Sequence, residues 1–150
     1  MKILFIDTLN TCRSPMAENI FRKLVKDDNL VDKIMCQSAG TGANTGDVPE
    51  EKAVECMKSW YLNLSSHRSR RFRAEEIPIW DGFFTMSKTH AYILEQLGVP
   101  TDKIYISKYI DDPSGKSLEE YENCRNLLAK EVMVFYARLK MVYEHRDYEI

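Results

Sequence analysis

The sequence predicts one α/β domain, built on a four-stranded parallel sheet with helices on both faces. Short apolar runs alternate with longer stretches whose apolar residues recur at helical spacing, and this strand-helix alternation repeats four times. Strands that are joined through helices run parallel, because each connection returns to the same end of the sheet. The 150 residues, 44% hydrophobic and 29% charged, suit a single globular domain over residues 1–150.

The four predicted strands are short apolar runs, at residues 2–6, 33–38, 82–86 and 103–107. The first helix is expected to begin at Ser14-Pro15, because Ser caps helices and Pro suits the first helical position. Gly98 and Pro100 are expected to end the helix that follows the third strand. The other predicted helices cover residues 49–60, 74–80, 87–97 and 117–143.

The net charge, the N-terminal residues and the cysteine and histidine spacing exclude several classes of protein. The formal net charge of -2 argues against a nucleic-acid binder. The apolar run after Met1-Lys2 is too short for a signal peptide or a membrane span, so a cytoplasmic location is expected. The cysteines, which show no C-x-x-C spacing, are expected to be free thiols: Cys12, Cys36, Cys56 and Cys124. The three histidines are scattered, and neither a metal nor a cofactor is expected.

The segment between the first strand and the first helix is the candidate site. In parallel α/β folds, ligands bind beyond the carboxyl ends of the strands. A strand-to-helix loop points its amides at a common centre, and the helix dipole adds positive charge there. Arg13 adds a planar guanidinium that suits a phosphate. On this pattern alone, an ordinary turn with a surface arginine is an equal alternative.

The residue identities in this segment indicate more specifically which kind of anion site it is. Residues 3–19, ILFIDTLNTCRSPMAEN, closely resemble the phosphate loop of the low molecular weight protein tyrosine phosphatases, which reads C-x5-R-S at the end of the first strand. Further segments resemble the family in the same order along the chain, at residues 38–42, 65–70, 81–86 and 112–113. Thr8-x-x-Thr11 and Met86-Ser87 more closely resemble the bacterial branch that includes protein arginine phosphatases.

The resemblance implies a two-step phosphoryl transfer without a cofactor, on a phosphorylated protein side chain, with free phosphate as the other ligand. In the family a thiolate attacks phosphorus, while an aspartic acid protonates the leaving group. By position, Arg13 would clamp the phosphate and Asp112 would be the acid, although an aspartate before proline is also common in plain turns. The implied phosphate-binding residues are Thr8, Leu9, Asn10, Thr11, Cys12, Arg13 and Ser14. The implied supporting network is Asn10, Ser14, Ser38 and His67.

The main departure from the family is Asp7, which stands where the nucleophilic cysteine belongs. A carboxylate is a weaker nucleophile than a thiolate, and the loop amides and Arg13 are expected to keep it ionised. An ionised Asp7 at ~4 Å would repel a phosphate by about 4 kcal/mol per unit charge at an effective dielectric of 20. Leu9 replaces a glycine and is expected to reshape the loop if its φ is positive, and Ser114 replaces an aromatic residue beside the mouth.

Two hypotheses about function follow. The first is an inactive or impaired phosphatase-like protein that binds phosphate or a phosphoprotein. The alternative is an active phosphatase in which Asp7 is the nucleophile, as in the haloacid dehalogenase phosphatases, but Leu9 stands where their second aspartate belongs. A receiver-like module is a weaker third reading, since the adjacent acidic pair is absent. In the arginine phosphatases that the chain resembles, a threonine at the Thr11 position goes with phosphoarginine, but the sequence leaves both the substrate and the oligomeric state open.

Overall fold

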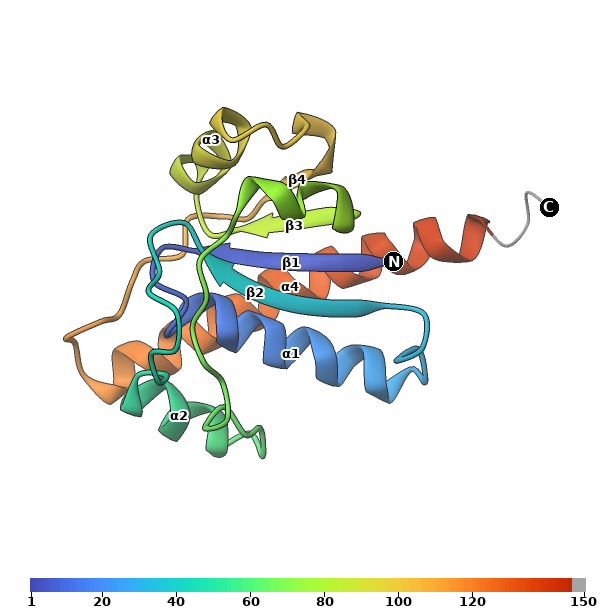
Figure 1. Ribbon diagram of the computed structural model, residues 1–150. Helices are drawn as coiled ribbons and strands as arrows, with labels where there is room; N and C mark the ends of the chain where they lie inside the picture. The colour runs from blue at the N-terminus through green and yellow to red at the C-terminus, as the bar shows by residue number, and fades with distance from the viewer. Residues whose placement is uncertain (147–150) are drawn as a thin grey trace.

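The predicted fold class is confirmed by the computed structural model, which describes residues 1–146. Four parallel strands form one sheet in the order β2-β1-β3-β4 (Figure 1). The strands are β1 (Lys2–Asp7), β2 (Met35–Gly40), β3 (Gly82–Thr85) and β4 (Ile104–Ile106). Residues 147–150, the end of the expected domain, lie outside the described part of the chain.

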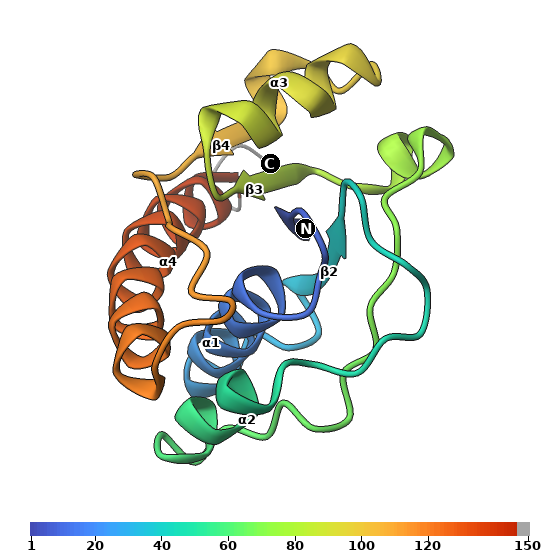
Figure 2. The ribbon, with the colours of Figure 1, turned by 90° about the vertical axis from the view of Figure 1, so that its left-hand side faces the viewer.

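Helices cover both faces of the sheet, as Figures 1 and 2 show. On one face lie α1 (Arg13–Asp27), α2 (Glu51–Lys58) and α4 (Leu118–Arg146). On the other lie α3 (Lys88–Gln96) and the 3-10 segment η1 (Ala74–Ile79), and a short second 3-10 segment, η2 (Thr101–Lys103), leads into β4. Among the described helices, none is both long enough and apolar enough to cross a lipid bilayer.

The two faces of β1 supply two separate cores. Ile3 and Phe5 point toward α1 and α4, and both side chains are fully buried. Leu4 and Ile6 point the other way, into a smaller core that includes Leu94 of α3. Successive side chains of a strand alternate between its faces, so a strand buried on both sides reads as an unbroken apolar run. This explains why the first strand was recognisable from sequence.

The strand order places the end of β1 at the centre of the sheet. The chain leaves β1 for β2 on one side and later returns to β3 on the other, so the direction of winding reverses beside β1. Ligand sites in such folds form at this reversal, outside the carboxyl ends of the strands. At the edge of this region a Cβ on Gly40 would collide with the main-chain oxygen of Thr8. Glycine at that position therefore lets β2 approach the loop closely.

The start of α1 differs from the prediction. The helix begins at Arg13, and Ser14 is not its cap but a residue of its first turn. Cys12 occupies the N-cap position without a side-chain cap hydrogen bond. The reason is that the Asp7 carboxylate, at the end of β1, accepts the hydrogen bond from the Ser14 amide that a capping side chain would otherwise accept. The expected helix over residues 74–80 is the 3-10 segment η1, which contains Pro78.

The aromatic cluster around β1 and β3 should dominate the stability of the fold. Phe84 is fully buried, with its ring centroid 5.2 Å from those of both Phe5 and Phe135. We expect Phe84→Ala to lower the free energy of unfolding by about 3–5 kcal/mol, because it removes a large side chain from a packed core. Urea denaturation measures this, with Val48→Ala, at a position 64% exposed, as the control that should change little. An equal loss in the two variants would contradict this account.

Candidate functional site

The carboxylate of Asp7 lies buried in the loop that joins β1 to α1, with 2% of the residue exposed. Its Oδ1 accepts a hydrogen bond from the Asn10 amide at 2.7 Å, and its Oδ2 accepts one from the Ser14 amide at 2.8 Å. Helix N-termini carry amides without an internal acceptor, and a carboxylate is well suited to bind them. Asp7 therefore acts as an anion supplied by the chain to its own loop.

The pKa of Asp7 shifts in the direction opposite to the one expected. The sequence predicts that the loop amides and Arg13 favour the ionised carboxylate. Burial instead raises the pKa of Asp7 above its ordinary value, although the amide hydrogen bond from Ser14 and the Arg13 charge oppose that rise. The desolvation of a fully enclosed carboxylate outweighs these favourable contacts. Asp7 consequently takes up a proton at a higher pH than an exposed aspartate would.

Asn10 organises the loop from its centre. It is fully buried, and its Nδ2 donates to Ser14 Oγ at 2.8 Å and to Ser38 Oγ at 2.9 Å. Its Oδ1 accepts the Arg70 amide at 3.0 Å, and its main-chain oxygen lies 2.7 Å from His67 Nε2. The structure thus brings together all four residues of the expected supporting network. They come from the loop, from the first turn of α1, from β2 and from the segment before η1.

The strained position of the loop is Asn10 and not Leu9. Asn10 has a φ of 58°, whereas Leu9 is not among the residues with positive φ. Asparagine enters the left-handed region more readily than most residues with a Cβ. Leu9 therefore incurs no left-handed penalty, and its side chain lies half exposed at the mouth of the loop. The expected reshaping by Leu9 would need a positive φ, which the structure does not give it.

The side chain of Arg13 links the loop to the segment between β4 and α4. It is buried, and its Nη1 donates to the main-chain oxygen of Ile110 at 3.0 Å. Its Nη2 lies 3.8 Å from Asp112 Oδ2, and the Asp112 side chain is 44% exposed. The carboxylate of Asp112 also accepts the Ser114 amide at 3.1 Å. The expected clamp and the expected acid are therefore neighbours at the mouth of the loop.

Glu50 is a residue of the site that the sequence reading missed, since it was taken only as part of a helix start. Its Oε1 accepts from Tyr121 Oη at 2.5 Å and from Ser114 Oγ at 2.8 Å. Its Oε2 accepts from Thr11 Oγ1 at 3.3 Å, and its amide donates to the Thr11 oxygen at 2.9 Å. Ser114, which replaces the expected aromatic wall, instead ties the acid segment to the start of α2.

His90 is the second missed residue. Its Nε2 lies 2.8 Å from Thr8 Oγ1, and its Nδ1 lies 2.8 Å from Ser87 Oγ. Burial, with a smaller contribution from Arg13, lowers the pKa of His90 to about 4, so the ring is neutral at neutral pH. The available signal was the Ser87-x-x-His90 spacing directly after β3, which places both side chains in one capping turn beside β1.

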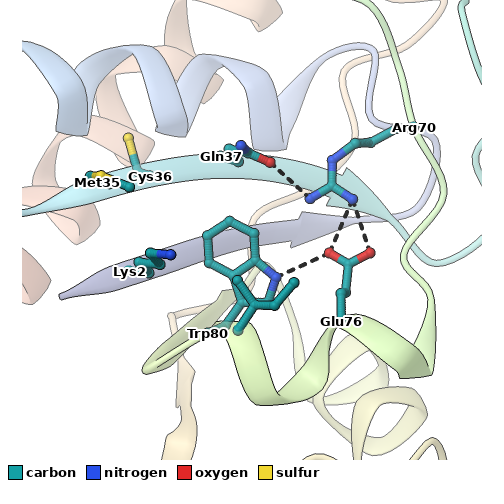
Figure 3. Close-up of a pocket in the computed structure, with 8 residues that line it drawn as sticks. Lys2, Met35, Cys36, Gln37, Arg70, Glu76 and Trp80 are labelled. Atoms are coloured by element: carbon teal, nitrogen blue, oxygen red, sulfur yellow. Dashed lines mark hydrogen bonds and ion pairs between the residues drawn. The ribbon is translucent and has the colours of Figure 1, made fainter.

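Arg70 supports the loop from outside. Its guanidinium lies in a surface groove of about 520 Å³ along β2 and η1, where Glu76 accepts two hydrogen bonds from it at 3.0 Å (Figure 3). Gln37 Oε1 accepts a further one at 3.2 Å, and Trp80 Nε1 donates to Glu76 at 3.0 Å. This network fixes the segment whose amide binds Asn10.

Amides remain available in the loop for an external anion. Within residues 1–146, the N–H groups of Leu9, Thr11, Cys12 and Arg13 have no protein acceptor. Together with the Arg13 guanidinium and the dipole of α1, they form a set of donors that suits a tetrahedral oxyanion. The thiol of Cys12 itself is buried, and burial raises its pKa, so it is not a ready nucleophile.

Comparisons with known proteins agree with this geometry. The sequence model described as low molecular weight phosphotyrosine protein phosphatase matches residues 2–144. The low molecular weight phosphotyrosine protein phosphatase of Sus scrofa is 34% identical over 97 residues, which span 64% of this chain and 61% of the porcine protein, less than two thirds of its length.

Solved structures of phosphatases also superpose on this chain. A low molecular weight protein tyrosine phosphatase from T. tengcongensis does so with a TM-score of 0.85 at 31% identity, covering 92% of this chain and 99% of the other. A mutant of the YwlE arginine phosphatase with a phosphorylated active-site serine gives a TM-score of 0.86 at 29% identity, with 93% and 96% covered.

Two substitutions of Asn10 should separate the stability that comes from its side-chain hydrogen bonds from the cost of its left-handed backbone conformation. We expect Asn10→Gly to lower the free energy of unfolding by about 2–4 kcal/mol, because buried partners lose their hydrogen bonds. Asn10→Ala should cost about 1 kcal/mol more, since alanine also resists the left-handed φ. Urea denaturation of the two variants measures both effects. Equal stability of the alanine and glycine variants would contradict the strain at this position.

Proposed function

This chain belongs to the low molecular weight phosphotyrosine protein phosphatase family, and from that premise we propose that it binds phosphorylated protein side chains or phosphate without the family's thiolate-dependent turnover. The observation that carries the proposal is the Asp7 carboxylate, which accepts two amides of the loop. By its place in the sequence, Asp7 stands where the family motif has its cysteine, so we infer that the loop keeps a binding geometry with an internal anion in place of the nucleophile.

Asp7 is poorly placed to replace a thiolate. Each of its two oxygens already accepts an amide hydrogen bond, and a carboxylate is a weaker nucleophile toward phosphorus than a thiolate. Cys12 is no substitute, because its thiol is buried and protonated. Asp112, for which the resemblance implies the role of general acid, therefore has no thiolate attack to assist.

Phosphate binding remains compatible with the loop. The unpaired amides and Arg13 supply the donors, whereas an ionised Asp7 supplies the opposing charge. Protonation of Asp7 removes that charge and leaves an O–H that can donate to a phosphate oxygen. The affinity for phosphate therefore depends on the protonation state of Asp7, because the loop donors attract the anion and an ionised Asp7 repels it.

The mouth of the site favours phosphoarginine over phosphotyrosine as the bound side chain. Glu50 and Asp112 give it negative charge, which attracts a guanidinium. No aromatic side chain follows Pro113, where Ser114 instead bonds to Glu50.

The four cysteines are free and buried, in keeping with the cytoplasmic location expected from the sequence.

The charge of Asp7 should make anion affinity depend on pH. Because burial raises the pKa of Asp7, the carboxylate takes up its proton at a higher pH than an ordinary aspartate does. Protonation removes the negative charge, so anion binding should become stronger as the pH falls toward that raised pKa. We expect sulfate affinity, measured by calorimetry, to rise as the pH falls from neutral to weakly acidic. Sulfate suits the test because its own charge does not change over this range.

The matched control for the pH test is Asp7→Ala. This variant should bind sulfate more than about tenfold more tightly at neutral pH, because the repulsion is gone, and it should show a much flatter pH dependence. The general rise in positive charge at low pH affects both proteins equally, so the difference between them isolates Asp7. Parallel pH profiles would show that Asp7 does not control the loop.

Restoring the thiolate should restore turnover. We expect the native chain to be silent on p-nitrophenyl phosphate, with and without magnesium, and Asp7→Cys to hydrolyse it, because the loop, Arg13 and Asp112 are already in place. The matched control is Asp7→Ser, which has a nucleophile of similar size but no thiolate and should stay nearly silent. Asp112→Asn in the Asp7→Cys background should lower kcat by about 100-fold or more.

Either of two results would overturn the proposed function. Turnover by the native chain that requires magnesium would assign Asp7 as an aspartyl nucleophile, the alternative that the sequence left open. A silent Asp7→Cys variant that still folds and binds sulfate would mean that the loop no longer supports phosphoryl transfer for reasons other than residue 7.

A further inference from the structure

Three side chains with metal-ligating atoms meet at the mouth of the loop. Cys12 comes from the phosphate loop, Glu50 from the start of α2 and Asp112 from the segment between β4 and α4. The Cys12 sulfur and one carboxylate oxygen from each acid all lie within 4.8 Å of one another. Neither the spacing of these residues in the sequence nor any role in phosphoryl transfer requires the thiol to face the two acids.

The thiol of Cys12 differs from the other three thiols of the chain. The residue is 3% exposed, and its sulfur has no hydrogen-bond partner within residues 1–146. The other three buried thiols each donate to a main-chain oxygen: Cys36 to Glu18, Cys56 to Ala53 and Cys124 to Asp111. Cys12 therefore presents an unsatisfied sulfur to two carboxylates instead of to the backbone.

The two carboxylates are held as the ligands of a metal site usually are. Glu50 is oriented by hydrogen bonds from Tyr121, Ser114 and Thr11. In known metal sites, hydrogen bonds from residues that do not bind the metal fix the orientation of the residues that do. Asp112 accepts the Ser114 amide, and its half-exposed side chain retains freedom to move.

The charge of the cluster also lacks a full counterpart. Arg13 lies 3.8 Å from Asp112, and it is the one cation paired with any of the three residues in the described structure. Glu50 is balanced by neutral donors only. The two carboxylates carry two negative charges against one guanidinium. A divalent cation would supply the missing positive charge and would displace the proton of the Cys12 thiol on binding.

We propose that Cys12, Glu50 and Asp112 form a binding site for a thiophilic divalent cation of the zinc class. Zinc binds sulfur at about 2.3 Å and carboxylate oxygen at about 2.0–2.2 Å, so tetrahedral ligands lie roughly 3.5 Å apart. The observed separations of up to 4.8 Å close by about an ångström, which the partly exposed Asp112 can provide. Magnesium and calcium prefer all-oxygen sites, so the sulfur selects against them.

A cation at this site leaves a fourth position for water or for an oxygen of a bound phosphoryl group. It would join the phosphate loop, the start of α2 and the acid segment, which in the protein alone are connected through hydrogen bonds of Glu50. The site does not depend on Asp7, and its ligands bind the cation whether or not the chain has any turnover.

Cobalt and zinc titrations of the metal-free full-length chain test the proposal. We expect one equivalent of Co²⁺ to produce the near-ultraviolet absorption of a thiolate-cobalt bond, and Zn²⁺ to abolish it by displacement. Cys12→Ser should remove the absorption and weaken Zn²⁺ binding, measured by calorimetry, by about tenfold or more. Glu50→Gln, which leaves the buried core intact, should weaken Zn²⁺ binding similarly. Cys36→Ser, at a buried thiol on β2, is the matched control and should change neither.

Two outcomes would overturn the assignment. The first is the absence of thiolate-cobalt absorption in the native chain at a stoichiometric addition of Co²⁺. The second is an absorption that survives Cys12→Ser or is lost in Cys36→Ser, since the metal would then bind another cysteine. Unchanged Zn²⁺ affinity in Glu50→Gln would likewise remove Glu50 from the site, even if Cys12→Ser proved too unstable to interpret.

Discussion

The hydrogen bonds from the Asn10 and Ser14 amides to the Asp7 carboxylate are the interaction on which the rest of the site depends. A loop at the start of a helix concentrates amides that need an acceptor, and in this family an external phosphate can supply one. Here the chain provides its own anion. Two of the loop amides consequently have an acceptor without a ligand, and the burial of Asp7 that accompanies these contacts also raises the pKa of its carboxyl group.

The loop keeps its shape because Asn10 draws together segments that are distant in the sequence. Its side chain reaches Ser14 in α1 and Ser38 in β2, and Arg70 and His67 bind it from the segment before η1. None of these contacts involves the side chain of residue 7. The residue at position 7 can therefore set the chemistry of the loop while these contacts keep its geometry.

The mouth of the site has a different electrostatic character from its base. Amide donors and Arg13 at the base suit an anion, whereas Glu50 and Asp112 at the mouth suit a cation. A phosphoarginine side chain carries both charges in the matching order, and a divalent cation with a bound phosphoryl oxygen does so as well. The same physical arrangement thus underlies the proposed ligand and the proposed metal site.

The sequence by itself determined the succession of strands and helices along the chain and the position of the loop, because hydrophobic periodicity and a motif are properties of neighbouring residues. It also shows Asp7 at the place where the motif that it resembles has a cysteine. Only the tertiary structure decided the raised pKa of Asp7, which depends on complete burial, and the left-handed φ at Asn10. It alone placed His90 against Thr8, and Cys12 beside Glu50 and Asp112. These pairs are far apart along the chain, and only the parallel sheet, by bringing the carboxyl ends of its strands to one edge, makes them neighbours.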